Sequence, residues 1–213
     1  MKQWLIVAAL GLAGCASGPS PQTDVLAIGD SILAWNSFSD RDIPSQVAQK
    51  TGLTVFNAAE NGAEFFEAPT IPDQYEPGPW DWVIVDGGGN DLGKTCLRPA
   101  AAQAVLDALI APDLSGAYAD LLDQIRADGP RVIIMGYAPV SIRGGPFEGC
   151  AEVLDDLNDR QSALAAVLDG VFFVDARSVI SPEDLEAYAI DRVHPTPLAG
   201  DLISDLIVEV LRR

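Results

Sequence analysis

The chain is poor in the residues that most often bind metals and nucleic acids. Its 213 residues include one histidine, three cysteines and only 13 lysines and arginines, against 31 aspartates and glutamates, so its formal net charge is −18. A single histidine and the lack of a Cys-x-x-Cys motif argue against a zinc site. An acidic chain without a basic cluster repels phosphate backbones, which excludes nucleic acid as an expected partner. Hydrophobic residues make up 48% of the chain, which favours a globular domain over a disordered chain.

No apolar run is as long as a membrane-spanning helix requires. The run from Trp4 to Ala13 has ten residues, whereas a span needs about 20. With Lys2 before it, the run has the size of a signal-peptide core. We therefore expect a signal peptide over residues 1–14, followed by a flexible tether over residues 15–23 that contains proline and serine.

The end of that run, Leu12-Ala13-Gly14-Cys15, resembles the bacterial lipobox, in which the cysteine is lipidated and becomes the first residue. The resemblance implies lipidation of Cys15, export, and a membrane contact through the lipid anchor alone. Ala16 follows the cysteine, which favours the outer membrane, facing the periplasm, over the inner membrane. The alternative is an ordinary signal peptide with an incidental cysteine.

The other two cysteines, Cys96 and Cys150, lie in segments rich in glycine and proline. An exported protein folds in an oxidising compartment, so we expect a disulfide between them, although two unpaired thiols are the alternative. Such a bond would tie the Pro139–Gly149 loop to the segment after Asn90. That loop is rich in glycine and proline, and whether it is a mobile lid stays open.

From Asp24 onward, short apolar runs alternate with longer amphipathic segments. The runs predict five strands, at Val25–Ile28, Leu53–Phe56, Trp82–Val85, Arg131–Met135 and Val171–Val174. The amphipathic segments predict helices at Ile43–Lys50, Pro99–Ile110, Gly116–Ala127, Ala151–Leu168 and Leu198–Leu211. This alternation predicts an α/β domain over residues 24–213, with a parallel sheet covered on both faces.

In such sheets the ligand site lies beyond the carboxyl ends of the strands. Polar and glycine-rich blocks follow three of the predicted strands, and a fourth block precedes the last helix. These blocks are Gly29-Asp30-Ser31, Asn57 to Gly62, Gly87 to Asp91 and Asp191 to Pro195.

The four blocks contain the groups that an ester hydrolase requires. Ser31, at a strand-to-helix turn, is the candidate nucleophile, and His194, the only histidine, is the candidate base. Asp191, three residues earlier, is placed to orient the imidazole. The backbone N–H groups of Ser31 and Gly62, with the side-chain amide of Asn90, would form the oxyanion hole.

Together the blocks resemble the SGNH, or GDSL-like, hydrolase superfamily over about Asp24 to Arg213. Gly29-Asp30-Ser31 matches its serine block, Gly88 to Asp91 its Gly-x-Asn-Asp block, and Asp191 to Pro195 its Asp-x-x-His-Pro block. The glycine block departs at Ala59 and Asn61, which puts the Gly62 donor in doubt. The resemblance implies a three-layer α/β/α sandwich with a five-stranded, flavodoxin-like sheet, the same roles for the residues named above, and no metal or organic cofactor.

Other residues near these blocks have structural interpretations. Asp30, Asp86 and Asp91 are expected to hydrogen-bond the loops, and Asp175 is a less suitable partner for His194 than Asp191. Five aromatic residues of the expected loops either pack in the core or form an acyl or sugar contact surface; they are Trp35, Phe38, Phe65, Phe66 and Phe147. Arg143 and Arg192 are expected to be solvated or ion-paired.

The sequence therefore predicts a serine ester hydrolase that cleaves carboxylic esters or thioesters through a Ser31-His194-Asp191 triad. The expected substrates are small acyl esters, lipids or O-acetylated carbohydrate, which fold and motif do not distinguish. A monomer is favoured. The alternative is a non-catalytic envelope lipoprotein that uses the same fold as a binding module.

Overall fold

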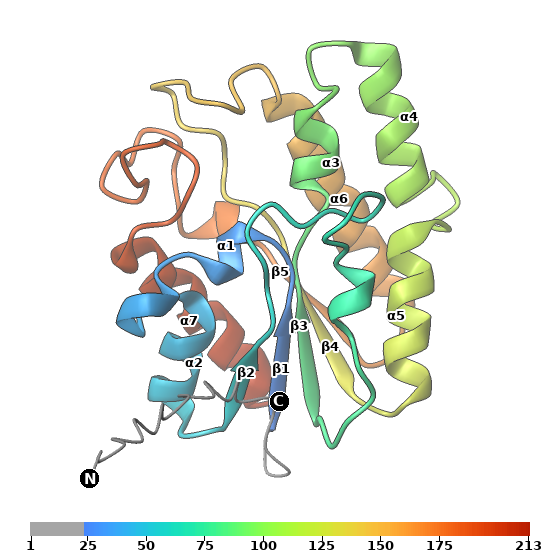
Figure 1. The fold of residues 1–213 in the computed structure, drawn as a ribbon, viewed down its shortest axis with the longest axis vertical. Helices are drawn as coiled ribbons and strands as arrows, with labels where there is room; N and C mark the ends of the chain where they lie inside the picture. The colour runs from blue at the N-terminus through green and yellow to red at the C-terminus, as the bar shows by residue number, and fades with distance from the viewer. Residues whose placement is uncertain (1–23) are drawn as a thin grey trace, which may run out of the picture.

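The computed structural model describes residues 24–213, in which a five-stranded parallel sheet lies between two layers of helices (Figure 1). The strand order is β2-β1-β3-β4-β5. The strands are β1 (Val25–Ile28), β2 (Val55–Asn57), β3 (Trp82–Val85), β4 (Arg131–Met135) and β5 (Val171–Val174). The predicted three-layer α/β/α sandwich with a flavodoxin-like order is thus confirmed. The predictions for the signal peptide, the tether and Cys15 fall outside the described residues.

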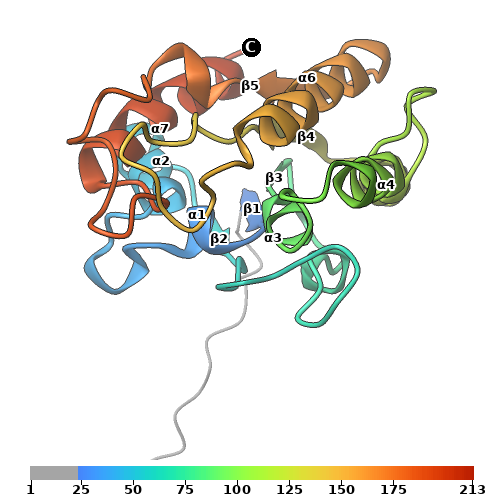
Figure 2. The ribbon, with the colours of Figure 1, turned by 90° about the horizontal axis from the view of Figure 1, so that it is seen from above.

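The two helical layers explain why the strands are largely apolar. One layer consists of α2 (Ile43–Thr51) and α7 (Pro197–Leu211), and the other of α4 (Pro99–Leu109), α5 (Ala117–Ala127) and α6 (Ala151–Val167). Seen from above, α2 and α7 lie on one side of the strands, and α4 and α6 on the other (Figure 2). In β1, Ala27 packs toward α2 and α7, whereas Leu26 packs toward the opposite layer. Both faces of β1 and β3 are therefore buried, whereas β2 and β5, at the edges of the sheet, are only partly buried.

The boundaries of the helices follow local capping. Asp42 accepts a hydrogen bond from Ser45 N (3.0 Å) at the start of α2, and Gly52 ends that helix with a left-handed φ of 75°. Thr196 caps α7, whose residues Ala199 and Ile203 are buried against the sheet. The predicted apolar stripe of α7 is wrong at Leu198, which is 48% exposed because it lies one residue off the line that faces the sheet.

Three other differences from the sequence prediction have local causes. Strand β2 begins at Val55 and not at Leu53, because Leu53 N bonds to Thr51 Oγ1 and Thr54 N bonds to Asp24 Oδ2. The helices α1 (Ser31–Ala34) and α3 (Gly89–Gly93) are too short for an apolar periodicity to reveal them. Three 3₁₀ turns, η1 (Ser37–Ser39), η2 (Pro72–Gln74) and η3 (Ala176–Ser178), were likewise not predicted.

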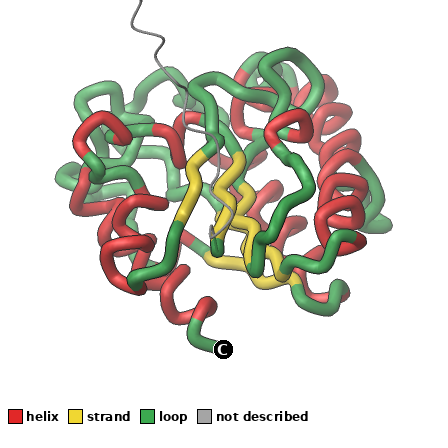
Figure 3. The backbone as a smooth tube through the Cα atoms, turned by 60° about the horizontal axis from the view of Figure 1, so that its bottom comes forward, coloured by secondary structure: helices red, strands yellow, loops and turns green. Residues whose placement is uncertain are grey.

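Loops make up most of the edge at which the strands end, whereas helices flank the strands along their length (Figure 3). Within residues 24–213, no helix is long and apolar enough to cross a membrane.

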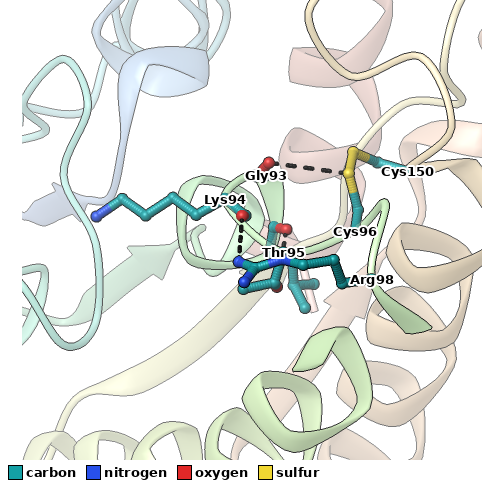
Figure 4. The surroundings of a disulfide bond; sticks show 7 residues. Gly93, Lys94, Thr95, Cys96, Arg98 and Cys150 are labelled. Atoms are coloured by element: carbon teal, nitrogen blue, oxygen red, sulfur yellow. Dashed lines mark hydrogen bonds between the residues drawn. A yellow bond between two sulfur atoms is a disulfide. The ribbon is translucent and has the colours of Figure 1, made fainter. Parts of the chain in front are cut away.

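The expected disulfide joins Cys96, after α3, to Cys150, at the start of α6 (Figure 4). The two Cα atoms are 5.0 Å apart, and the bond closes a separation of 54 residues. Cys150 is fully buried and belongs to the core that α4, α5 and α6 share. The bond thus fixes one end of the Pro139–Gly149 loop to the segment that follows α3.

Removing this cross-link is expected to destabilise the fold. A loop of this length predicts that a Cys96→Ala, Cys150→Ala double variant loses about 2–4 kcal/mol of unfolding free energy, chiefly because its unfolded chain gains entropy. Urea unfolding measures the loss. A reducing agent should destabilise the wild type and leave the double variant unchanged. Coincident unfolding curves for wild type and double variant would contradict the structural role of the bond.

Candidate active site

The candidate nucleophile lies where the strand order reverses. Strands β1 and β3 are neighbours, and the chain leaves β1 toward β2 and β3 toward β4, so their carboxyl ends flank the switch point of the sheet. Ser31 is the first residue of α1, directly beyond β1. Asp30 caps this short helix by accepting a hydrogen bond from Ile32 N (2.8 Å). The side chain of Ser31 is therefore presented at the edge where sequence reasoning expected it.

His194 and Asp191 lie in a tight turn before α7. His194 Nδ1 is 2.7 Å from Asp191 Oδ2, while Asp191 Oδ1 accepts hydrogen bonds from Val193 N (3.0 Å) and His194 N (3.1 Å). Arg192, within the turn, has a left-handed φ of 66°. Partial burial raises the pKa of Asp191, but the hydrogen bonds from His194 and the two backbone N–H groups outweigh it and hold that pKa below its usual range. Asp191 is thus an ionised partner for the imidazole.

Asp175, the alternative partner, is engaged elsewhere. It caps η3 by accepting from Arg177 N (2.9 Å), and it forms an ion pair with the Arg177 guanidinium, whose Nε lies 2.9 Å from Asp175 Oδ1.

Ser31 lines the same pocket as the residues next to His194, and no hydrogen bond joins Ser31 to His194. The pocket has a volume of about 740 Å³ including its open mouth, and it is lined by Ser31, Asn90 and the two neighbours of His194, Val193 and Pro195. Among the described residues, Ser31 Oγ has no hydrogen-bond partner within 3.5 Å. In ligand-free sites such contacts commonly tighten only when substrate binds.

The three candidate oxyanion donors come from three different loops. Asn90 Nδ2 donates to Ala63 O (3.0 Å) and, through a longer hydrogen bond, to Asp30 Oδ2 (3.5 Å), so its amide is fixed beside the loop that contains Gly62. Gly62 has a left-handed φ of 76°. Within residues 24–213, neither Ser31 N nor Gly62 N donates to a protein acceptor. Both N–H groups are therefore available to a ligand.

The two departures in the glycine block do not distort this loop. Ala59 has no positive φ, and its N–H bonds to Asn57 Oδ1 (3.1 Å), so an alanine fits there without backbone strain. Asn61 is exposed and has no positive φ, because Gly62 makes the left-handed turn.

A buried polar network lies beneath the nucleophile. Asp30 N donates to Asp86 Oδ1 (2.9 Å), and Tyr137 Oη donates to Asp30 Oδ2 (2.7 Å) while it accepts from Gly89 N (2.9 Å). Burial raises the pKa of Asp30, and burial together with the charge of Asp30 raises that of Asp86 well above its usual range. The loops after β1, β3 and β4 are thereby joined through side chains, as expected for Asp30 and Asp86. Sequence spacing gave no sign of Tyr137, which is 107 residues from Asp30.

Asp91 also has the structural role expected of it. Its carboxylate accepts hydrogen bonds from Phe65 N (3.0 Å) and Phe66 N (3.3 Å), which anchors the loop that follows Gly62. Burial raises the pKa of Asp91 to about 6, although those backbone N–H groups oppose the shift.

The five aromatic residues have different environments. Phe65 is buried in the core, Phe147 lines the pocket, and Phe38 is fully exposed. Phe66 is 49% exposed, and Trp35 packs face to face on His194, with ring centroids 3.9 Å apart. Of these five residues, only Phe147 lines the pocket, so the predicted aromatic contact surface reduces to Phe147.

The Pro139–Gly149 loop covers one side of the pocket and is tied down at several points. Tyr188 Oη donates to Pro139 O (2.8 Å), Ile142 N donates to Pro182 O (3.1 Å), and Cys150 closes the loop through the disulfide. Most of the remaining pocket lining is apolar, namely Ile32, Ala138, Val140, Phe147, Leu154, Ile180, Ala187, Val193 and Ile203. Arg192 lines it as well, and no carboxylate of the described residues lies within ion-pair distance of its guanidinium.

In residues 24–213, no group of three histidine, cysteine or acidic side chains is arranged to bind a metal.

Comparisons with known proteins show the family of the chain and agree with its fold. Residues 27–200 match the model of the GDSL-like lipase/acylhydrolase family. No match is found among curated proteins. Solved structures share the fold: a lipolytic protein of the G-D-S-L family from Veillonella parvula has a TM-score of 0.68 at 15% identity, covering 90% of this chain and 99% of that one. The aryl esterase of M. smegmatis has a TM-score of 0.60 at 22% identity (89% and 98% covered), and an extracellular lipase from Streptomyces rimosus has 0.59 at 20% (89% and 98%).

The raised pKa of Asp86 predicts a pH-dependent stability. A carboxyl group whose pKa is raised by folding contributes stability that is fully present below its unfolded pKa of about 4 and is lost as the pH rises through the folded value. Asp86→Asn keeps the acceptor for Asp30 N and has no proton to lose. The variant's melting temperature should therefore exceed that of the wild type by a margin that grows with pH, about 2–4 °C for each kcal/mol.

The matched control is Asp73→Asn, which removes an exposed carboxylate. Its melting temperature should follow that of the wild type at every pH. A difference between Asp86→Asn and wild type that stays constant from pH 4 to pH 9 would contradict the protonation of Asp86 in the fold.

Proposed function

Because the chain belongs to the GDSL-like lipase/acylhydrolase family and is an ester hydrolase of the SGNH type, we propose that it cleaves carboxylic esters or thioesters with Ser31 as nucleophile and through an acyl-enzyme. The observation that carries this assignment is the contact of 2.7 Å between His194 Nδ1 and Asp191 Oδ2 in a turn that shares its pocket with Ser31.

The contact determines which nitrogen of His194 acts as base. The ionised Asp191 accepts a hydrogen bond from Nδ1–H, so the Nε2 lone pair is left to take the proton of Ser31. Ser31 Oγ then attacks the carbonyl carbon, and His194 returns the proton to the leaving alcohol or thiol. The same imidazole takes a proton from water, which attacks the acyl carbon. The bond between that carbon and Ser31 Oγ then breaks as His194 returns the proton to Ser31 Oγ, which releases the acid and restores the enzyme.

Negative charge that develops on the carbonyl oxygen is stabilised by N–H groups already in place. We assign this role to Ser31 N and Gly62 N, which have no acceptor among the described residues. We also assign it to Asn90 Nδ2, whose long hydrogen bond to Asp30 Oδ2 (3.5 Å) an oxyanion would replace while the bond to Ala63 O (3.0 Å) is kept. Donors that are fixed before the reaction stabilise the transition state without a reorganisation cost.

The pocket is suited to bind an acyl group of modest size, which would be the acid part of the substrate. Its wall is largely apolar, with Val140, Phe147 and Leu154 contributed by the Pro139–Gly149 loop and α6. Small acyl esters, lipid esters and O-acetylated carbohydrates all present such a group. The chain-length preference distinguishes acetyl from longer acyl substrates.

The direct test is hydrolysis of p-nitrophenyl acetate, butyrate and octanoate by wild type and variants. Ser31→Ala and His194→Ala should each lower kcat by at least about 10⁴-fold. Asn90→Ala should lower kcat by about 10²–10³-fold, because one oxyanion donor is lost. Acetate preference would favour deacetylation, and octanoate preference would favour lipid substrates.

Asp175→Asn is the matched control for the triad assignment, and we expect it to retain wild-type kcat. Activity that survives in Ser31→Ala would show that the nucleophile is wrong. No activity on any ester, in a folded protein, would favour the alternative of a non-catalytic envelope lipoprotein.

We also propose that the chain is exported and anchored to the outer membrane, facing the periplasm, through a lipid on Cys15. The support is the sequence Leu12-Ala13-Gly14-Cys15 and the apolar run before it.

For the anchor, we expect the full chain produced in a bacterium to sediment with membranes and to be released by detergent. Its N-terminal peptide should carry a diacylglycerol mass on Cys15. Cys15→Ser should abolish both properties, whereas the Cys96→Ala, Cys150→Ala variant should keep them. Wild-type protein recovered without a lipid would exclude the anchor.

A further inference from the structure

The indole ring of Trp35 lies flat on the imidazole ring of His194. The ring centroids are 3.9 Å apart, and the ring planes differ by 8°. Trp35 is also the residue that ends α1, and its backbone N–H donates to Ser31 O (2.9 Å). The side chain of Trp35 therefore contacts the proposed base, and its backbone is hydrogen-bonded to the proposed nucleophile.

The next residue strengthens this link. Asn36 adopts a left-handed φ of 70°, and its Nδ2 donates to Pro195 O (3.1 Å), directly after His194. Trp35 and Asn36 thus hold the ring of His194 and the backbone beside it, although 159 residues separate Asn36 from Pro195. The turn of the base and the loop after the nucleophile form one connected unit.

Asp191 alone does not determine the position of the imidazole. Its hydrogen bond to Nδ1 fixes one edge of the ring, but a ring held at one edge can still tilt about the line that joins Nδ1 to Oδ2. A flat aromatic face against the imidazole removes that freedom and also shields one side of the ring from water. The edge contact and the face contact together determine where Nε2 points.

We propose that Trp35 is a positioning residue that sets the plane of the His194 ring and couples it to Ser31. This inference rests on the proposed role of His194 as the base. It assigns Trp35 to the catalytic geometry and not to the substrate-binding surface, because one indole face is covered by the imidazole and Trp35 is not among the residues that line the pocket.

Kinetics separate these two roles. Trp35→Ala should lower kcat by about 10–10²-fold with little change in KM, as expected when a catalytic group is misplaced by about 1 Å. Trp35→Phe, which keeps a flat ring, should recover most of the loss. Phe38→Ala, which removes a fully exposed aromatic from the same loop, should match the wild type. A rise in KM with an unchanged kcat would overturn the proposal, because Trp35 would then bind substrate.

The single histidine of the chain gives a second readout that does not need activity. In a full-length protein without a histidine tag, every imidazole resonance in the NMR spectrum belongs to His194. The ring current of a stacked indole shifts the imidazole carbon-bound protons upfield. We expect this shift in the wild type, its loss in Trp35→Ala, and no change in Phe38→Ala. Wild-type spectra without an upfield shift would overturn the stacking.

The two readouts distinguish the failure of this inference from that of the proposed function. If the shift is present and Trp35→Ala keeps the wild-type kcat, the positioning role is wrong and the triad stands. If the shift is present but no ester is hydrolysed by the wild type, the proposed function fails, and the positioning role fails with it. Should Trp35→Ala fail to fold, Trp35→Phe and Trp35→Leu give the same comparison of a flat with a non-planar side chain.

Discussion

The hydrogen bond from Asp30 N to Asp86 Oδ1 connects the ends of β1 and β3, and the geometry of the site depends on it. Asp30 directly precedes Ser31, and Asp86 begins the turn that leads to Asn90. Two buried carboxyl groups so close together cannot both be ionised without a large cost. Burial and the charge of Asp30 raise the pKa of Asp86, which favours its protonated form, while Asp30 accepts hydrogen bonds from Ile32 N and Tyr137 Oη. The nucleophile and one oxyanion donor are thereby held at a fixed distance by the interior of the protein.

Other segments are joined by side chains that bond to a distant backbone. Asn90 Nδ2 bonds to Ala63 O, and Tyr188 Oη bonds to Pro139 O. Gln74 both accepts from Gly29 N (2.7 Å) and donates to Gly29 O (2.9 Å), just before the nucleophile. Loops that are cross-linked in this way lose conformational freedom during folding, so that less has to be lost when substrate binds. The disulfide at Cys150 serves the same purpose on the outer side of the pocket.

Much of the fold could be predicted from the sequence because buried parallel strands must be apolar on both faces. The strands β1, β3, β4 and β5 match the predicted runs, and only β2, at the sheet edge, is shifted by side-chain bonds of Thr51 and Asp24. The blocks with Ser31 and Asn90 could be placed because strand ends in such a sheet share one edge.

Contacts between distant segments could not be predicted in this way. Tyr137 reaches Asp30, and Trp35 stacks on His194, from positions that no local periodicity marks. In the sequence, Trp35 is one of five aromatic residues in predicted loops. Only the folded structure shows that it lies against His194. Leu198 is a case in which local periodicity predicted too much. Its helical spacing predicts burial, but the direction of α7 leaves it exposed.

The central claim is that Ser31 becomes covalently modified during turnover. An aryl fluorophosphonate, which reacts with activated serines, tests it when the intact mass and the peptides of the protein are measured after labelling. The account predicts one adduct for each chain, located on Ser31, with labelling lost in Ser31→Ala and strongly slowed in His194→Ala. Label on a different residue, or equal labelling of the Ser31→Ala variant, would contradict it.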